Sequence, residues 1–353
     1  QATILLEFYS ATGGDSWNDR SGWASGQGDG CDWYGVECDG GGNVVAISMK
    51  NNGLTGTPPS TIYRLPELTK LDLMANAIDF RFRGIFEATK LQNLWISNTG
   101  LSSTDDIDEI GQLPLKELRI SQNKIGGPIP KTIFGIPSLE YVSLSHNAFT
   151  GTLPTEIGLL TNLEEFHLYG GSITGQIPTE IGNIGASLKR LALSENEFTG
   201  TLPAGALNKL TNLVELSVHQ TSKSGRGIGG TLPSLSGMKK LTRLHLNSNS
   251  LKGPLPADLL SGSSVADDEV SIMLGDNQFT GTIPAAWSRF QQLTLDLSGN
   301  MITGIGSGLC GMGDWNEGAV SSYGCDAILC PVGEYNSNGK QAGGTSTCQS
   351  CPS

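Results

Sequence analysis

The stretch Leu139–Pro154, which reads LEYVSLSHNAFTGTLP, decides the fold. Apolar and polar residues alternate up to Asn147, which is the pattern of a strand with one buried face. The same order of residues returns every 23 to 28 residues, and the position of Asn147 (the turn residue) is occupied in turn by Asn52, Asn76, Thr99, Asn123, Asn147, Gly171, Asn196, Thr221, Asn249, Asn277 and Asn300. Such self-similarity predicts eleven stacked repeats.

Each part of the repeat has a physical role. The strands recur at a fixed spacing, so each pairs in parallel with the next, and a slip by one residue would expose every leucine. The turn asparagine can donate to and accept from backbone groups of neighbouring turns. In segments such as Gly175–Pro178, glycine permits a tight turn and proline favours an extended backbone, which accounts for many of the 48 glycines.

The full pattern, L-x-x-L-x-L-x-x-N-x-L-x-G-x-I-P, resembles the plant-type leucine-rich repeat over residues 44–305. The resemblance implies an α/β repeat solenoid, a right-handed superhelix of about eleven repeats with a parallel concave sheet. It also implies a helical N-terminal cap and a disulfide-bonded C-terminal cap, because the end repeats would otherwise expose their apolar faces.

Both caps are visible in the sequence. Within residues 1–43, Ile4–Tyr9 predicts a short amphipathic helix, and the stretch from Cys31 to Cys38 resembles the C-x-W-x-G-V-x-C cap, implying a disulfide between these two cysteines. By the same cap resemblance, Cys310 and Cys325 would close a C-terminal cap at residues 306–329.

Residues 330–353 form a cysteine-rich tail with Cys330, Cys348 and Cys351. They resemble the start of an extracellular ephrin-receptor-like repeat, which implies a Cys330–Cys348 disulfide and an unpaired Cys351 whose partner lies beyond Ser353 in a longer protein. A zinc knuckle would need a second cysteine pair at suitable spacing. A thioredoxin-like motif would need a βαβ unit, which the tail lacks.

Composition excludes some classes of protein and favours a compartment. The formal net charge of −12 disfavours nucleic-acid binding, and no apolar run reaches the roughly 18 residues of a membrane span. Disulfide-capped repeats indicate an oxidising, extracellular environment, secreted or at the cell surface. The chain opens at Gln1 without a leader, so we expect any secretory signal to have been removed. The cap and tail look similar to secreted algal or stramenopile proteins.

Positions 3, 5, 7 and 8 of each repeat point to the concave face, and all four histidines of the chain fall on these positions. Exposed aromatic and arginine side chains are typical anchors of interfaces. We therefore predict a partner-binding footprint comprising Trp95, Arg119, Tyr141, His146, Glu165, His167, Tyr169, Arg190, His219, Lys223, Arg226 and His245. A solvated polar face is the alternative, as is a tolerated surface loop for the insertion that carries Lys223 and Arg226.

We considered three kinds of chemistry on these residues. His167 and His245 lie about 14 Å apart by strand spacing, too far to share an ion, whereas His219, His245 and Glu215 would form a weak site. Ser143, His167 and Glu165 resemble a triad, but an open sheet offers no oxyanion pocket. The acidic stretches 105–109 and 267–269 lack the spacing of a calcium site. We predict no catalytic residue, metal or cofactor.

The favoured function is a non-enzymatic extracellular recognition or adhesion module. It would bind a protein, peptide or carbohydrate ligand on its concave face, within a cell-surface receptor-like or matrix-attached protein, with no nucleic-acid partner and no membrane insertion in this stretch. An inhibitor of secreted hydrolases, similar to polygalacturonase-inhibiting proteins, and a structural spacer are the alternatives. The sequence makes no prediction of oligomeric state.

Overall fold

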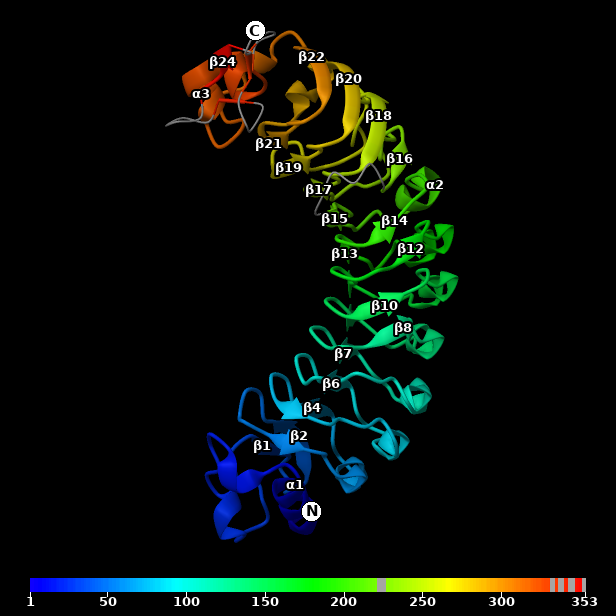
Figure 1. The fold of residues 1–353 in the computed structure, drawn as a ribbon, viewed down its shortest axis with the longest axis vertical. Coiled ribbons are helices and arrows are strands. Elements are labelled where there is room, and N and C mark those ends of the chain that lie inside the picture. Colours follow the sequence, from blue (N-terminus) through cyan, green and yellow to red (C-terminus); the bar gives the residue numbers. More distant parts are fainter. Residues whose placement is uncertain (221–226, 331–333, 336–339, 342–346, 351–353) are drawn as a thin grey trace. The chain divides into compact units, whose positions relative to one another are not determined.

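The computed structural model describes residues 1–220, 227–330, 334–335, 340–341 and 347–350. The chain divides into two compact units, Gln1–Ser172 (unit 1) and Ile173–Ser353 (unit 2). Each unit is built from the same short strands and turns, repeated along the chain (Figure 1).

The N-terminal cap begins with the expected helix, α1 (Ala2–Ala11), followed by η1 (Gly14–Ser16), η2 (Trp23–Ser25) and β1 (Val36–Cys38). α1 buries Leu5 and Phe8, and the Phe8 ring lies 5.7 Å from Trp17 and 6.1 Å from Trp23. Aromatic rings of this size supply a large apolar area. They therefore cover the open end of the first repeat.

Six parallel strands follow in unit 1: β2 (Val44–Ser48), β4 (Lys70–Asp72), β6 (Asn93–Trp95), β7 (Glu117–Arg119), β9 (Tyr141–Ser143) and β11 (Glu165–His167). β1 joins this sheet antiparallel to β2, which the sequence did not predict. The parallel register places each inward residue beside its equivalent, as Leu118 beside Val142, and both are fully buried. The predicted inward positions are confirmed.

The opposite side of unit 1 carries short strand pairs and 3-10 helices (Figure 1). The strands pair as β3 (Thr55–Gly56) with β5 (Ala77–Ile78) and β8 (Gly126–Pro128) with β10 (Ala148–Thr150). The helices are η3 (Ser60–Arg64), η4 (Ile85–Glu87), η5 (Ile107–Gln112), η6 (Lys131–Gly135) and η7 (Thr155–Leu159). The outer side of these repeats thus carries short 3-10 helices, a form that is frequent in connecting segments.

Unit 2 repeats this plan. Its parallel sheet contains β13 (Arg190–Ala192), β15 (Glu215–Ser217), β17 (Arg243–His245), β19 (Glu269–Met273) and β21 (Gln292–Asp296). The other side carries β12 (Thr174–Gly175), β14 (Glu197–Phe198), β16 (Gly229–Gly230), β18 (Ser250–Pro254), β20 (Gln278–Ile283), β22 (Met301–Ile305), η8 (Thr179–Ile184), α2 (Ala204–Leu207) and η9 (Ala285–Arg289). Among the described residues, the main sheet strands of the two units thus include eleven parallel ones, the number of predicted repeats.

The chain ends in a small C-terminal region with η10 (Leu309–Gly311), α3 (Ala319–Tyr323), η11 (Gly324–Ala327) and an antiparallel pair, β23 (Glu334–Tyr335) and β24 (Gln349–Ser350). Trp315 is fully buried here, and its indole N–H donates to the Phe290 carbonyl over 2.7 Å. This contact ties the region to the last repeats of unit 2.

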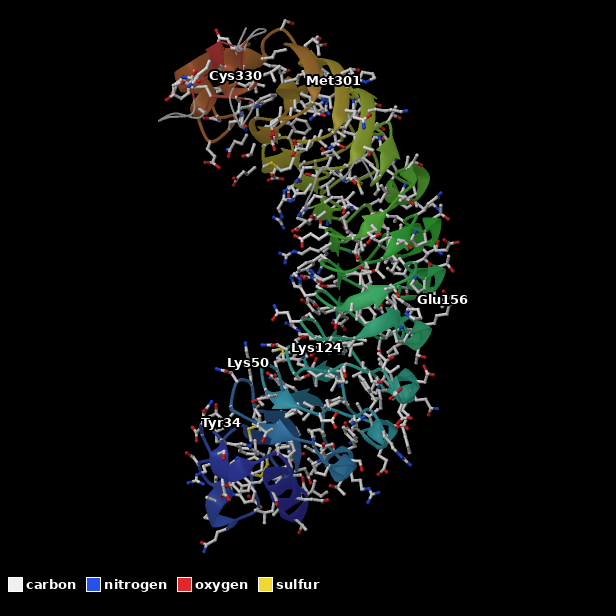
Figure 2. All side chains as sticks on the ribbon, viewed as in Figure 1. Tyr34, Lys50, Lys124, Glu156, Met301 and Cys330 are labelled. Atoms are coloured by element: carbon white, nitrogen blue, oxygen red, sulfur yellow. A yellow bond between two sulfur atoms is a disulfide. The ribbon has the colours of Figure 1, made fainter. Side chains whose placement is uncertain are left out.

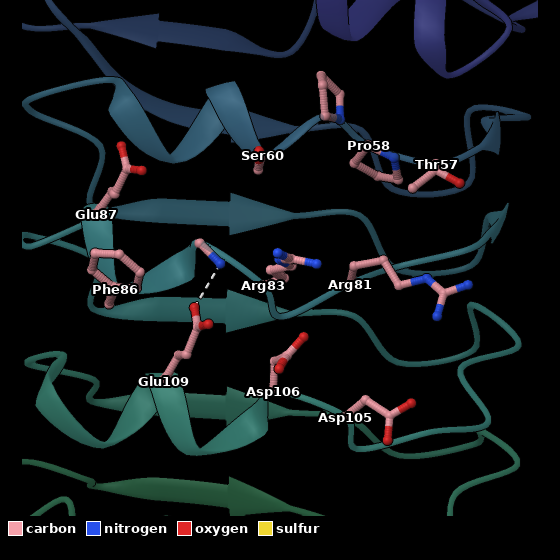
Figure 3. Close-up of a pocket in the computed structure, with 12 residues that line it drawn as sticks. Thr57, Pro58, Ser60, Arg81, Arg83, Phe86, Glu87, Asp105, Asp106 and Glu109 are labelled. Atoms are coloured by element: carbon pink, nitrogen blue, oxygen red, sulfur yellow. Dashed lines mark hydrogen bonds between the residues drawn. The ribbon is translucent and has the colours of Figure 1, made fainter.

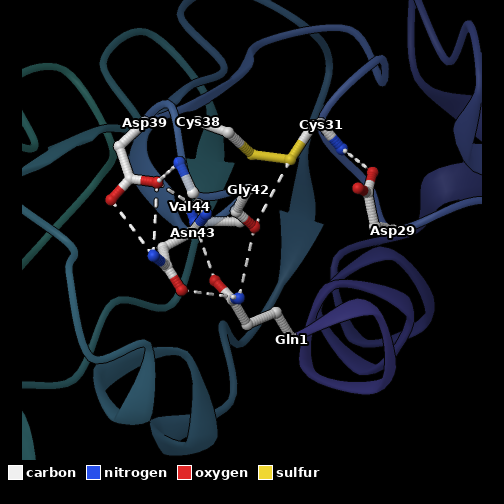
Figure 4. Close-up of a disulfide and its surroundings, with 9 residues drawn as sticks. Gln1, Asp29, Cys31, Cys38, Asp39, Gly42, Asn43 and Val44 are labelled. Carbon is white, nitrogen blue, oxygen red and sulfur yellow. Dashed lines mark hydrogen bonds between the residues drawn. A yellow bond between two sulfur atoms is a disulfide. The ribbon is translucent and has the colours of Figure 1, made fainter.

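The described residues contain three disulfides, Cys31–Cys38, Cys310–Cys325 and Cys330–Cys348. Figure 4 shows Gln1 beside the first, where its side-chain oxygen accepts from the Val44 N–H over 2.7 Å. Cys351 lies outside the described residues, so its unpaired state stays a prediction, as do the proposed domain boundaries.

The turn asparagines join consecutive repeats. The Asn76 side-chain oxygen accepts from the N–H groups of Asn52 and Leu54, at 3.0 and 2.9 Å, and its amide donates to the Met49 carbonyl at 2.7 Å. Asn76 itself is buried. One side chain thus satisfies three buried backbone groups of the preceding repeat, which would otherwise be left unpaired.

Candidate functional site

The side of the strands in unit 1 that faces away from the 3-10 helices is here named the sheet face. Figure 2 shows Lys50 and Lys124 on the strand side and Glu156 on the helix side. Trp95, Arg119, Tyr141 and His167 lie on the sheet face and are half-buried. The predicted orientation of these strand positions is confirmed in this unit.

Rings and cations stack across four neighbouring strands of this face. The Lys70 ammonium on β4 lies 4.5 Å from the centre of the Trp95 ring on β6. The Arg119 guanidinium on β7 lies 4.7 Å from the same ring and 4.2 Å from the Tyr141 ring on β9. Cations within about 6 Å of an aromatic face are attracted by its quadrupole. Arg119 is therefore held between two rings.

The stack continues onto β11 and the turn after it. The Tyr141 ring lies 5.2 Å from His167, and His167 lies 6.5 Å from Tyr169. Tyr169 meets His146 edge-on at 4.9 Å. We name the whole set, Lys70, Trp95, Arg119, Tyr141, His146, His167 and Tyr169, the aromatic–cation ladder. All of these residues except Lys70 belong to the footprint predicted from the sequence.

Carboxylates on the same strands fix two members of the ladder. Glu117 pairs with Arg119 at 2.9 Å, and Glu165 lies 3.0 Å from the Nε2 atom of His167. Each glutamate stands two residues before its partner and therefore points to the same side of the sheet. Burial raises the pKa of Tyr141, with a further contribution from Glu165 and an opposing one from Arg119. Its hydroxyl is therefore neutral at physiological pH and able to donate a hydrogen bond.

The ladder stands on small residues that neighbouring side chains cover. Ser97, Ser143 and Ser145 are all buried, so the face is less solvated than its polar sequence suggests. Asp72 is buried too, and burial raises the pKa of its carboxyl group. A shallow hollow of about 240 Å³ lies beside Arg119 and Tyr141. The surface thus combines large rings with a depression.

His146 owes its position to the turn. It is exposed and has a left-handed backbone, with φ of 52°, as have the equivalent residues Asn51, Gln122 and Glu195 in other repeats. A side chain in this conformation costs about 1–2 kcal/mol relative to the right-handed one. The turn of the repeat therefore imposes the left-handed backbone conformation at this position, and the imidazole is not its cause.

In unit 2, the predicted footprint residues are arranged differently. His219 Nδ1 lies 2.9 Å from the Ser194 hydroxyl and 3.0 Å from that of Ser217, while His245 Nε2 lies 3.3 Å from the Ser271 hydroxyl. Burial lowers the pKa of both imidazoles. These histidines are therefore neutral partners of serines, and no arginine among the described residues stacks on them.

The other predicted residues of unit 2 are distributed along and after its strands. Arg190 is exposed on β13, beside Glu215 in the register of β15. Lys223 and Arg226 lie outside the described residues.

The weak metal site and the triad considered from sequence do not assemble. Glu215 pairs with Arg243 at 2.9 Å while His219 and His245 meet serines, and no group of three potential ligands able to hold a metal occurs in the described part of the chain. His167 does meet Glu165, but the Ser143 hydroxyl is a partner of Tyr141.

A second concavity was missed by sequence analysis. It lies on the helix side of unit 1, has a volume of about 680 Å³, and is lined by residues between Thr57 and Glu109 (Figure 3). Its sequence signal is the absence of the Gly-x-Ile-Pro segment from the two repeats that begin at Asn76 and Thr99.

Comparison with known proteins supports the same architecture. Residues 1–39 match the model of the leucine rich repeat N-terminal domain, and residues 114–136 and 138–160 match that of the leucine rich repeat. Over 133 residues the chain is 30% identical to the receptor-like protein kinase BRI1-like 3 of Arabidopsis thaliana. This matched stretch is 36% of the chain and 11% of the kinase.

Two solved structures resemble it over most of its length. The ectodomain of the Arabidopsis receptor kinase HAESA, in complex with an N-terminal extended IDA peptide hormone ligand, has a TM-score of 0.70 and 28% identity, covering 85% of this chain and 49% of that one. The ectodomain of the Arabidopsis thaliana receptor kinase GASSHO1/SCHENGEN3, in complex with CASPARIAN STRIP INTEGRITY FACTOR 2, has a TM-score of 0.68 over 89% of this chain and 43% of that one; at 24% identity it shows the fold alone.

The chain spans less than half the length of these ectodomains and about a ninth of the curated kinase. Among the helices of the described residues, none has the length and apolar character needed to cross a membrane. The repeats, the two kinds of matching model and the HAESA ectodomain agree: the chain has the fold of a leucine-rich-repeat solenoid and is similar to plant leucine-rich-repeat proteins.

Proposed function

We propose that the chain is a non-enzymatic, extracellular recognition module that binds a peptide through the sheet face of unit 1, as part of a cell-surface receptor-like protein. The HAESA ectodomain, 28% identical, was solved with a peptide hormone bound. That likeness supports a peptide rather than a carbohydrate as the ligand class. The three disulfides support an extracellular location.

The aromatic–cation ladder is the observation that carries this proposal. Arg119 is held between Trp95 and Tyr141 and is paired with Glu117. A guanidinium fixed in this way loses little side-chain entropy when it meets a ligand, and tryptophan, tyrosine and arginine dominate binding energies at interfaces. The ladder is therefore organised before any ligand arrives.

The ladder also indicates what the peptide carries. Lys70 and Arg119 supply positive charge at one end, and the rings of Tyr141, His167 and Tyr169 supply apolar area beyond them. A peptide with a carboxylate near an apolar or aromatic side chain would match both. Arg119 can donate two parallel hydrogen bonds to that carboxylate.

The test is selection from a random peptide library displayed on phage, followed by titration calorimetry with synthetic copies of the selected peptides. We expect Arg119→Ala to weaken binding at least tenfold, about 1.4 kcal/mol, because it removes the central group of the ladder. The matched control is Arg64→Ala, which removes an arginine paired with Glu87 on the helix side of the same unit.

The control should bind like the wild type, and both variants should keep its circular dichroism spectrum. Selected peptides that bind Arg119→Ala as tightly as the wild type, or a library that yields no binder, would contradict the proposal. Binding of cell-wall hydrolases in place of peptides would favour the inhibitor alternative.

A further inference from the structure

The concavity on the helix side of unit 1 arises from a change of sequence at equivalent positions of neighbouring repeats. The seventh residue after the turn residue is Pro59 in the first repeat, but Arg83 in the second and Asp106 in the third. The outer strand pair formed by β3 and β5 ends at Ile78, and the next outer strand described, β8, begins at Gly126. The wall of the repeat is therefore interrupted here.

An aromatic ring is exposed at the same place. The second repeat is one residue shorter than the first. When positions are counted back from the next turn residue, Phe86 is equivalent to Tyr63 and Phe134. Those two rings are buried, whereas Phe86 is 52% exposed. Ile85, like the equivalent Ile62 and Ile133, is fully buried. The ring of Phe86 thus forms part of the pocket lining rather than of the core.

Several charged groups of the pocket are already satisfied. Arg81 pairs with Asp79 at 2.6 Å, and Glu87 pairs with Arg64 at 2.8 Å. Glu109 accepts a hydrogen bond from the N–H of Gly84 over 2.6 Å (Figure 3). Gly84 has a φ of 85°, a conformation suited to glycine, and its Cβ position would lie 3.3 Å from that of Ser60. These contacts hold the floor of the pocket.

The remaining charged side chains of the pocket have no partner among the described residues. Arg83, Asp105 and Asp106 are exposed and make no side-chain hydrogen bond or ion pair with any residue that the structure describes. Figure 3 shows Arg83 between Ser60 of one repeat and Asp106 of the next. Donor groups and acceptor groups therefore stand side by side, next to an exposed aromatic ring, in a hollow of a size typical of ligand sites.

We infer that this pocket binds a neutral oligosaccharide. An anionic ligand would meet the carboxylates of Asp105 and Asp106, and a cationic ligand would meet the Arg83 guanidinium. Sugar hydroxyl groups both donate and accept hydrogen bonds, so a neutral sugar can use all three groups. The apolar face of a pyranose ring packs on an aromatic side chain such as Phe86.

The site is separate from the proposed peptide-binding face, because its lining residues leave the repeats on the opposite side. Neither proposal depends on the other. A glycan at this position would allow the protein to attach to a polysaccharide matrix while its sheet face remains available. The two sites can therefore be tested independently on one folded chain.

The experiment is titration calorimetry of the purified chain with four neutral hexaoses, laminarihexaose, cellohexaose, xylohexaose and mannohexaose, alongside an oligogalacturonate and a random peptide pool. We expect at least one neutral hexaose to bind, and Phe86→Ala and Arg83→Ala each to weaken that binding at least tenfold. The matched control for the ring is Leu159→Ala, which truncates another exposed apolar side chain of unit 1, 60% exposed.

Arg119→Ala, on the sheet face, should leave oligosaccharide binding unchanged. Since Phe86 and Arg83 are exposed, both variants should melt within about two degrees of the wild type. The inference is overturned if no neutral hexaose binds, if only the oligogalacturonate or peptides bind, or if Phe86→Ala and Arg83→Ala both bind the hexaose like the wild type.

Discussion

At the scale of single residues, the buried turn asparagines determine how one repeat attaches to the next. Asn147 accepts from the Ile125 N–H at 3.1 Å and donates to the carbonyls of Ile120 and Leu144 at 2.9 and 3.0 Å. Two of these groups belong to the preceding repeat. The identity of the residue could be understood from sequence because an amide is a donor and an acceptor at once.

Asn147→Ala should therefore lower the free energy of unfolding by about 2–4 kcal/mol, since it leaves buried backbone groups without partners. Denaturant unfolding followed by circular dichroism measures this loss. The control is Asn183→Ala, at an exposed asparagine, which should change stability by less than about 0.5 kcal/mol. Equal losses in the two variants would contradict the role assigned to the turn residue.

The stability of the fold depends on pH through His219. Burial lowers the pKa of His219, while Glu195 opposes the shift. The unfolded chain, with a histidine pKa of about 6.5, then binds more protons than the folded one below that value. The stability that His219 contributes is complete above pH 6.5 and is lost as the pH falls through its lower, folded pKa.

Comparison of wild type with His219→Gln measures this contribution. The difference in unfolding free energy between the two proteins should change between pH 7.5 and pH 5, in the direction that disfavours the wild type in acid. His146→Gln, at an exposed histidine of unit 1, serves as the control. A difference for His219→Gln that is independent of pH would refute the assignment.

At the scale of strands and turns, the periodicity of the sequence predicted which side chains face inward. It did not predict features that depend on contacts between repeats or with the cap. Leu118, Val142 and their equivalents could be placed inward because alternation within a strand determines sides. The pairing of β1 with β2 could not be predicted, because it joins segments of different pattern. Phe86 was missed because counting from either end of the shortened repeat makes it equivalent to a buried residue, Ile62 or Tyr63.

The same limit applies to the candidate site. The spacing of the repeat predicts that Trp95, Arg119 and Tyr141 share one face. It does not predict their stacking, because stacking depends on side-chain rotamers and on residues of the neighbouring strand. Lys70 was missed for this reason, since it reaches Trp95 across the strand boundary.

Leu193→Asp tests the inward positions at this scale. Leu193 is fully buried, and a carboxylate placed there would lack a partner, so we expect a loss above about 3 kcal/mol and unfolding of neighbouring turns. Thr199→Asp, at an exposed position of the same repeat, is the control and should be nearly neutral. A loss below about 1 kcal/mol for Leu193→Asp would show that the side chain does not face inward.

At the scale of the whole molecule, stability is distributed along the chain. Each repeat contacts mainly its neighbours, so free energy accumulates repeat by repeat rather than around one centre. The register therefore matters more than the length of the chain.

Deleting residues 124–147 removes one complete period and joins Asn123 to Ala148, which keeps every position in register. We expect this variant to fold, with reduced stability and an unchanged circular dichroism spectrum per residue. Deleting residues 124–135 removes only the first half of that period, so the repeats that follow lose their register. We expect this second variant to fail to fold. If both deletions behave alike, register does not control assembly.

The aromatic–cation ladder has a consequence for how such proteins diversify. Its members come from five successive repeats, and the row of equivalent strand positions accepts different chemical groups, as Trp95, Arg119 and Ser143 show at one shared position. Point changes along that row can exchange aromatic, basic and hydroxyl groups without disturbing the leucines beneath. Ligand preference can therefore evolve gradually, one side chain at a time, while the fold stays the same.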